Sequence, residues 1–368
     1  MFGEECEALK KGLVATVQAV GGTGGLRLAF ELLQRCCRIP YQLESGLVVY
    51  VPSPSWPNHV NIALESGVAP ECLHRYRYYD EGEKEFNFKG MLEDLRAAPP
   101  GAVVLLHVCA HNPTGMDPTP SQWESIAEVV RKGALIPLFD NAYQGFATGK
   151  LEEDAYPVCL FERRGLQFLV VCSFSKSMGL YSTRTGALHA VCSSRREAEI
   201  VLGNLKSLAR PMYSNPPAMG ARAAAVVMSD KALKQQWKGE LSFMAGRISR
   251  MRQLLVDNLK AVGAPGCWDH LVTQRGMFGY TGLTTVQVKR LREDHHVYMS
   301  SSGRISMAGV NKANVKVVAS LPYYSASGWI VLFSLGCVLL PLLKLNLCVR
   351  KSYMRYYLKL NTVCMVVI

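Results

Sequence analysis

Residues 168–186 read FLVVCSFSKSMGLYSTRTG, an apolar run that breaks into Ser-Phe-Ser-Lys and continues to a second cation, Arg184. A short apolar run rich in β-branched residues and bounded by polar residues and glycine predicts a buried strand. Lys176 then stands at the carboxyl end of that strand. There it is either a solvated turn residue or a nucleophile held in place, and the rest of the sequence decides between these readings.

The same design, an apolar run or a glycine turn with a helical pattern beside it, recurs along the chain. The segments are VQAVGGTGGLRLAFELLQR (17–35), GLVVYVPSPSWPNH (46–59), GAVVLLHVCAHNPTG (101–115) and GALIPLFDNAYQGF (133–146). A helix is expected over 119–133, with Ser121 as its cap and Glu124 three residues on. Apolar strands that alternate with helices predict an α/β fold, with a mostly parallel central sheet and helices on both faces.

Polar and aromatic side chains gather at the predicted strand ends. In open α/β sheets, ligands bind beyond the carboxyl ends of the strands. The residues that fall there are Trp56, Asn112, Asp140, Tyr143 and Lys176.

The pattern changes beyond about residue 230. Residues 231–263 form one long amphipathic helical stretch, and residues 276–310 read as strand, short helix, strand, strand. We therefore predict a large domain over 1–235, a smaller α+β domain over 236–320, and a tail over 321–368 that is foreign to the fold. Residues 321–343 are uncharged and long enough for a transmembrane segment. The cations that flank this segment lie mainly on its C-terminal side, the opposite of a tail-anchored protein, so a foreign tail is favoured over a membrane span.

Composition excludes several function classes. The chain has a net charge of +12 without a Lys/Arg block, which argues against nucleic acid as a partner. Its 12 cysteines include no C-x-x-C pair, which predicts no metal site and a reducing compartment. The first residues resemble neither a signal peptide nor a transit peptide. A cytoplasmic location is expected, with a mitochondrial parent enzyme or membrane association through the tail as alternatives.

Each strand-end residue has an ordinary explanation when taken alone, but together they match the needs of pyridoxal 5'-phosphate. Lys176 supplies an amine for a Schiff base, and Asp140 a carboxylate that keeps the pyridine nitrogen protonated. A glycine turn opening a helix, hydroxyls and an arginine suit the phosphate, and an aromatic ring suits the ring face. The phosphate residues are Gly22, Thr23, Ser173 and Arg184; Asn112 and Tyr143 hold the phenolic oxygen, and Trp56 stacks on the ring.

Six blocks in order along residues 3–320 carry a family resemblance. They are PSPSWPNH, HVCAHNPTG, FDNAYQGFATG, SFSKSMGLYSTRTG, RPMYSNPP and SSGRISMAG. With these blocks the chain resembles the aspartate aminotransferases, within the class I pyridoxal-phosphate aminotransferase family of fold type I.

The resemblance implies roles for further residues. Lys176 also moves the proton between the substrate and the cofactor, and His59 and His111 support Asp140. Arg304 binds the substrate α-carboxylate, and Arg210 reaches into the partner subunit's site to bind the side-chain carboxylate. Two arginines imply dicarboxylic amino acids and oxo-acids, aspartate and 2-oxoglutarate among them, and a homodimer with shared active sites. Aromatic amino acids are an alternative substrate class.

Both ends of the chain depart from the family pattern. The family has a sizeable segment before the position of Phe2, so Met1 is expected to be an internal methionine. After residue 320 the family's final amphipathic helix gives way to apolar sequence. A catalytically impaired, cofactor-binding remnant, truncated or membrane-associated, is therefore the alternative to an active enzyme.

Overall fold

The computed structural model describes residues 1–3, 6–36 and 46–326, with side chains as far as residue 320. Its centre is a seven-stranded sheet in the order β1-β9-β8-β7-β6-β2-β3. The strands are β1 (Val14–Val20), β2 (Val49–Ser53), β3 (Leu73–Arg77), β6 (Val103–His107), β7 (Ile136–Asn141), β8 (Phe168–Ser173) and β9 (Thr185–Val191). Only β9 runs against its neighbours, pairing antiparallel with both β1 and β8. The prediction of a mostly parallel sheet is confirmed.

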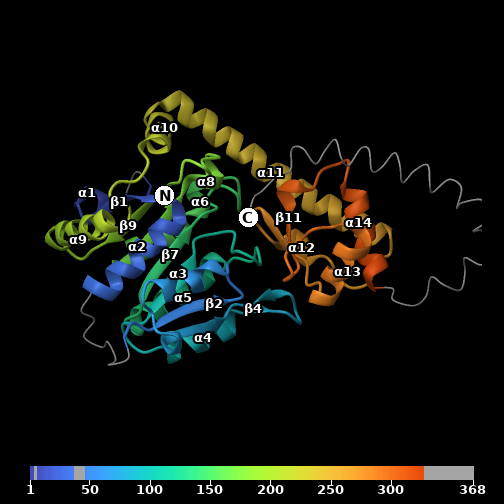
Figure 1. Ribbon diagram of the computed structural model, residues 1–368, viewed down its shortest axis with the longest axis horizontal. Helices are drawn as coiled ribbons and strands as arrows, with labels where there is room; N and C mark the ends of the chain where they lie inside the picture. Colours follow the sequence, from blue (N-terminus) through green and yellow to red (C-terminus); the bar gives the residue numbers. More distant parts are fainter. Residues whose placement is uncertain (4–5, 37–45, 327–368) are drawn as a thin grey trace, which may run out of the picture.

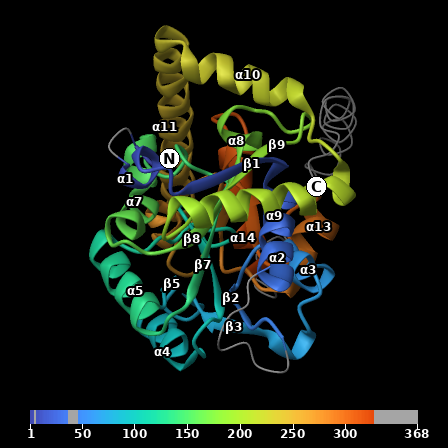
Figure 2. The same ribbon diagram turned by 90° about the vertical axis from the view of Figure 1, so that its left-hand side faces the viewer.

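Helices cover both faces of this sheet (Figure 2). One face carries α2 (Gly21–Cys36), α3 (Asn58–Glu65) and α9 (Arg195–Tyr213), and the other carries α4 (Phe88–Ala97), α5 (Pro120–Lys132) and α7 (Tyr156–Arg163). Successive strand residues point to opposite faces, so β6 sends Val104 and Leu106 into one core and Val103 and Leu105 into the other. A strand buried on both faces must be apolar throughout, which explains the uninterrupted runs in the sequence.

The start of α5 differs from the expectation. Thr119, not Ser121, is the N-cap: its side chain accepts from the N–H of Gln122, and Gln122 returns a bond to the Thr119 N–H. Pro120 occupies the first helical position, where its missing N–H costs nothing. This capping box displaces the pair formed by Ser121 and Glu124 that the sequence suggested.

A second group of helices and strands lies beyond a long helix, away from the sheet (Figure 1), and takes the name of the predicted smaller domain. The long helix is α11 (Lys231–Ala261), preceded by α10 (Ala218–Ser229). The smaller domain contains α12 (His270–Thr273), β10 (Phe278–Tyr280), α13 (Thr285–His295), β11 (Arg304–Ser306) and α14 (Val315–Ala326). The boundary expected after residue 235 falls inside α11. A third buried cluster spans both parts and packs Tyr143 and Phe146 with Leu241 and Ile248 of α11.

One predicted strand of the smaller domain is wrong. Two strands, β10 and β11, form the small sheet among the described residues, and the segment around Val297 is not a strand. The reason is the end of α13: His296 adopts a left-handed conformation, and the N–H of Val297 turns back to the carbonyl of Leu291. The residues expected to begin a strand are used to close a helix.

The remaining short elements connect these parts. They are α1 (Glu7–Lys10), the hairpin β4 (Tyr79–Asp80) and β5 (Glu85–Phe86), α6 (Leu151–Asp154), α8 (Phe174–Ser177) and the 3-10 turns at Pro70–Cys72 and Met307–Gly309. Within the described ranges, no helix is long and apolar enough to cross a membrane. Most of the expected apolar segment 321–343, and the tail after it, lie outside the described residues.

Candidate active site

The carboxylate at the end of β7 is buried and held by a histidine. Asp140 is 7% exposed, and its Oδ2 lies 3.0 Å from Nε2 of His59, a fully buried residue of α3. The other ring nitrogen of His59 is 2.8 Å from the hydroxyl of Ser55, which fixes the ring. Burial alone would raise the pKa of Asp140. The hydrogen bond with His59 and the charge of the nearby Lys176 outweigh burial, and the pKa of Asp140 is lowered. Asp140 is therefore an anion ready to pair with a cationic ring nitrogen.

Two more histidines continue this cluster behind Asp140. His107, at the end of β6, lies edge-on to His59 with ring centroids 5.1 Å apart, and His111 lies 4.2 Å from His107. His111 also stacks on Tyr78 at 3.8 Å and bonds Thr114 through Nδ1. Burial lowers the pKa of His107 to about 3, so this ring is neutral. His111 thus lies one ring farther from Asp140 than expected, and His107, which sequence reasoning missed, lies between them.

Two hydrogen bonds connect Arg304, Asn112 and Tyr143. The amide nitrogen of Asn112 is 3.4 Å from the Tyr143 hydroxyl, and Arg304 donates from Nη1 to Oδ1 of Asn112 at 2.8 Å. The guanidinium of Arg304, at the start of β11, lies 4.2 Å from the centroid of the Phe278 ring. Burial raises the pKa of Tyr143, so its hydroxyl stays protonated and can donate. The smaller domain thereby delivers a cation to residues of the sheet domain.

Lys176 lies on α8, the short helix that begins directly after β8. Its ammonium nitrogen is 5.0 Å from the centroid of the Tyr143 ring. Burial lowers the pKa of Lys176, and the charges of Arg184 and Arg304 lower it further, against the opposing charge of Asp140. This environment increases the fraction of free amine at neutral pH. Lys176 is half-buried against Tyr143, so it is not a fully solvated turn residue.

The N-terminus of α2 forms an anion-binding cradle with β8 and β9. Gly21 has φ +67°, and a side chain there would overlap the guanidinium of Arg184. A Cβ at Gly22 would lie 3.2 Å from Cβ of Ser173. The Gly21 N–H donates to the carbonyl of Arg184 at 2.9 Å. The first turn of α2, which contains Thr23, carries no acidic residue, so its remaining N–H groups and its dipole favour an anion. Glycine is needed here because backbone, hydroxyl and guanidinium converge on one point.

The comparisons with known proteins agree with this geometry. The family model for aminotransferase class I and II matches residues 1–320. The chain belongs to the aminotransferase class I and II family. It is 46% identical over 319 residues to the cytoplasmic aspartate aminotransferase of Oryza sativa subsp. japonica, covering 87% of this chain and 76% of that one. It is also 46% identical over 320 residues to the mitochondrial aspartate aminotransferase P2 of Lupinus angustifolius, covering 87% and 68% of the two chains.

Solved structures give the same result. Aspartate aminotransferase from Trypanosoma cruzi superposes with a TM-score of 0.81 at 42% identity, covering 87% of this chain and 79% of that one. An aromatic-amino-acid aminotransferase from Burkholderia pseudomallei, covalently bound to pyridoxal phosphate, superposes with a TM-score of 0.83 at 40% identity and covers 88% and 78%. This aminotransferase therefore has fold type I and is a pyridoxal-phosphate-dependent transaminase.

The residues of this aminotransferase fit the cofactor. The donor set combines a lysine of lowered pKa, a buried carboxylate bonded to His59, and the start of α2 beside Ser173 and Arg184. Trp56 lies edge-on to His59, the partner of Asp140, with ring centroids 5.1 Å apart. Among the described residues, no group of three or more His, Cys, Asp or Glu could hold a metal ion.

Arg210 stands apart from these residues within one chain of the aminotransferase. It lies in the last turn of α9, is exposed, and donates from Nη1 to the hydroxyl of Ser214 at 2.7 Å. A role in binding substrate therefore requires a second chain, as the resemblance implied.

Two acidic residues behind the site were also missed by sequence reasoning. Asp117 accepts the N–H groups of Ala110 and His111 at 2.7 and 3.0 Å, next to Asn112. Asp154 accepts four hydrogen bonds from the loop after Tyr143. The left-handed Ala110, at φ +50°, shows how tightly the first loop turns. In the sequence both acids read as ordinary loop or helix-end residues, and only the fold reveals what they bind.

Proposed function

We propose that this chain exchanges an amino group between L-aspartate and 2-oxoglutarate through alternating half-reactions. The observation that carries the proposal is the bond from Arg304 to Asn112, because it places a cation for a substrate carboxylate beside Tyr143 and Lys176. A guanidinium binds a carboxylate with two parallel hydrogen bonds, which orients the substrate. The identity to aspartate aminotransferases over 87% of the chain supports the choice of substrate.

Pyridoxal phosphate supplies an electron sink for the substrate Cα–H bond when it is bound. The chain's own residues then divide the work. Asp140 keeps the ring nitrogen protonated, and Asn112 and Tyr143 hold the phenolic oxygen. Gly22, Thr23, Ser173 and Arg184 hold the phosphate, and Trp56 covers the ring. The Lys176 amine would take the proton from the substrate Cα and give it to the cofactor's C4′ carbon, a role that its lowered pKa favours by increasing the fraction of free amine.

The absorption spectrum of the purified chain with pyridoxal phosphate tests this function. We expect a band that Lys176→Ala abolishes and that L-aspartate removes, with one oxaloacetate released per site. A band that forms but ignores aspartate would support the alternative of a cofactor-binding remnant. The absence of any Lys176-dependent band would contradict the proposed function.

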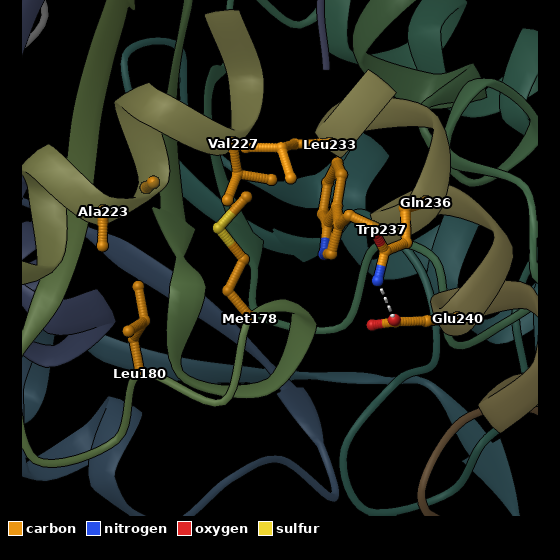
Figure 3. Close-up of a pocket in the computed structure, with 9 residues that line it drawn as sticks. Met178, Leu180, Ala223, Val227, Leu233, Gln236, Trp237 and Glu240 are labelled. Atoms are coloured by element: carbon orange, nitrogen blue, oxygen red, sulfur yellow. Dashed lines mark hydrogen bonds between the residues drawn. The ribbon is translucent and has the colours of Figure 1, made fainter. Parts of the chain in front are cut away.

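A homodimer with shared active sites is part of the proposal. The surface of α10 and α11 exposes large apolar side chains: Met219 at 79%, Val226 at 60% and Phe243 at 69%. A pocket of about 230 Å³ opens between these helices and the segment after α8, lined by Met178, Leu180, Val227, Leu233 and Trp237 among others (Figure 3). Apolar surface of this extent favours association. A second copy would also supply the second cation that one chain lacks.

Mixing two inactive variants tests the shared site. One chain carries Lys176→Ala and the other carries Arg210→Ala. If Arg210 serves the partner's site, each mixed dimer has one intact site, so an equimolar mixture regains about a quarter of wild-type activity with aspartate. No recovery in a mixture that demonstrably exchanges subunits would show that Arg210 acts elsewhere.

Aromatic amino acids are a second substrate class. The exposed Arg210 bonds Ser214 at the end of its own helix and pairs with no acidic side chain among the described residues. Aromatic aminotransferases are among the similar structures. Arg210→Ala should lower kcat/KM for aspartate and leave kcat/KM for phenylalanine within about twofold. An equal loss for both substrates would count against a role in selecting the side chain.

The compartment we propose is the cytoplasm. The similar relatives include cytoplasmic, mitochondrial and chloroplastic enzymes, so the family by itself leaves the compartment open. Imaging of the tagged full-length chain against mitochondrial and membrane markers tests it.

A further inference from the structure

The loop between β7 and α6 brings Tyr143 into the site and has little secondary structure of its own. Its polypeptide turns at Gly145, with φ +91°, and at Gly149, with φ +84°. The N–H of Phe146 returns to the carbonyl of Tyr143 at 2.9 Å. A loop that packs against other elements still has to satisfy its buried N–H groups, because each unpaired one costs free energy. In this loop one side chain satisfies three of them.

That side chain is Asp154, the last residue of α6. It is 3% exposed. Its Oδ2 accepts the N–H of Gly145 at 2.6 Å and the N–H of Ala147 at 3.1 Å. Its Oδ1 accepts the N–H of Thr148 at 3.0 Å and the Thr148 hydroxyl at 2.6 Å. Both oxygens are therefore committed to this loop, and none of the ion pairs among the described residues includes Asp154.

The loop is also confined from its other side by the long helix. A side chain at Gly145 would overlap Leu241 of α11, and a Cβ at Gly149 would lie 3.2 Å from the hydroxyl of Ser242. The Gln144 side chain adds a tie, since it accepts from Asn141 and donates to the carbonyl of Leu151, each at 2.8 Å. Because α11 limits the space on one side of the loop, the hydrogen bonds to the Asp154 carboxylate hold the loop backbone in its conformation.

We propose that Asp154 is a positioning residue of the active site, which sets the place of the Tyr143 hydroxyl by accepting the N–H groups of residues 145, 147 and 148. Tyr143 lies two residues before the first gathered N–H. Within the described part of the chain, its hydroxyl makes one hydrogen bond, a long contact of 3.4 Å from the amide of Asn112. Loosening the loop would therefore move the phenol relative to both Asn112 and Lys176. This inference rests on the proposed function for its meaning, but the placement of Tyr143 is measurable without cofactor.

The matched variants differ at neighbouring residues of α6. Asp154→Asn keeps the shape of the side chain but replaces one acceptor oxygen with an N–H group that opposes the loop donors. Glu153→Gln is the control, because Glu153 is exposed and pairs with Lys150 on the surface. Thr148→Val is a milder variant that removes a single donor to Asp154 and leaves the carboxylate in place. It keeps the test decisive if Asp154→Asn does not fold.

The first measurement uses the cofactor-free full chain labelled with ¹³Cζ-tyrosine, the Tyr143 resonance being assigned by its loss in Tyr143→Phe. Asp154→Asn should move this resonance and raise amide exchange at residues 145–148 by about tenfold or more, corresponding to the loss of a charge-assisted bond. Glu153→Gln should change neither. Faster exchange with an unmoved Tyr143 resonance would mean that Asp154 only stabilises the loop, and would overturn the proposal.

The second measurement is the pH at which the absorption of the cofactor-loaded enzyme titrates. The Tyr143 hydroxyl is proposed to donate to the phenolic oxygen of the cofactor, which favours the deprotonated form of the cofactor. Loss of that hydrogen bond should raise the pH midpoint, so Asp154→Asn should raise it by about half a unit to one unit. In a Tyr143→Phe background the same substitution should add almost nothing, since the two act through one group. Equal shifts in both backgrounds would overturn the proposal. A wild-type chain with no such band would contradict the proposed function, while the tyrosine resonance would still decide the role of Asp154.

Discussion

Arg304 and Asn112 are joined across the two domains by a 2.8 Å hydrogen bond from Nη1 to Oδ1. The same Asn112 side chain reaches the Tyr143 hydroxyl through its amide nitrogen. One amide therefore links the cation of the smaller domain to the phenol of the sheet domain. On the proposed function, a substrate carboxylate bound to Arg304 would also act on Asn112, the proposed partner of the phenolic oxygen.

Replacing Arg304 tests this link. Arg304→Lys keeps the charge but loses the planar fork, so kcat/KM for aspartate should fall by about 10- to 100-fold, the range for a charge-assisted hydrogen bond. Arg292→Lys is the matched control, because Arg292 is exposed on α13 and pairs only loosely, at 3.8 Å, with Glu293. Steady-state kinetics of both variants decide the matter, and equal effects would remove the special role of Arg304.

The bond between His59 and Asp140 predicts a cofactor-binding defect. His59→Leu leaves a buried carboxylate oxygen without its donor, so the pKa of Asp140 should rise. The dissociation constant of pyridoxal phosphate should then increase by about 10- to 100-fold, as expected for an unsatisfied buried polar group. Titration of the cofactor band measures this, with the exposed His74→Leu as control. An unchanged affinity in His59→Leu would show that Asp140 does not depend on His59.

Gly186 lies beside the anion-binding cradle, and we expect a side chain at this position to destabilise the chain. A Cβ at Gly186 would lie 2.5 Å from the carbonyl carbon of Gly21 and 2.8 Å from the carbonyl oxygen of Cys172, both backbone atoms that cannot move aside. Gly186→Ala should lower the free energy of unfolding by about 1–3 kcal/mol.

Gly203→Ala is the matched substitution, since Gly203 lies within α9 with nothing near its Cβ position. There alanine should stabilise the chain by about 0.5–1 kcal/mol. Denaturant unfolding of both variants compares them, and a destabilised Gly203→Ala would contradict the packing around α9.

Lys176 predicts a pH-dependent change in stability of the cofactor-free chain. Its pKa is lowered from 10.5 by burial and by neighbouring arginines. At a pH below its folded-state pKa, Lys176 is charged in both the folded and the unfolded chain. Burial of this charge in the folded chain lowers the free energy of unfolding. That loss of stability disappears as the pH rises through the folded-state pKa toward 10.5. Lys176→Met should therefore be more stable than wild type at pH 7, and the difference should shrink toward pH 9.5. A difference that grows with pH would reverse the sign of the argument.

The places of Asp140 and Lys176 at the ends of strands were predictable, because they depend on local sequence patterns. Asp140 and Lys176 follow uninterrupted apolar runs, which only strands buried on both faces require. Strand direction has no such signal, so the antiparallel β9 could not be read from its composition. His107 was missed for a related reason: it is the last residue of β6, and a histidine inside an apolar run looks like one more core residue.

Residues that act through the backbone of another segment were the hardest to predict. Asp117 and Asp154 bind N–H groups, and every residue other than proline offers one, so no side-chain pairing in the sequence points to them. The end of α13 shows the same limit. The left-handed His296 and the returning N–H of Val297 depend on backbone geometry, and the β-branched valine suggested a strand.

Helix α11 has 31 residues and packs on both parts of the molecule. At 1.5 Å per residue, about 30 Å separate Leu241, which packs on the loop carrying Tyr143, from Ala261 at the far end. A tilt of about five degrees around Leu241 would carry the far end through about 2–3 Å, close to the length of one hydrogen bond. Leu241 packs beside the loop that carries Tyr143, and α11 also packs on α12 and α14 of the part that holds Arg304. A tilt of this size would therefore change the position of Arg304 relative to Tyr143 by a distance comparable to one hydrogen bond.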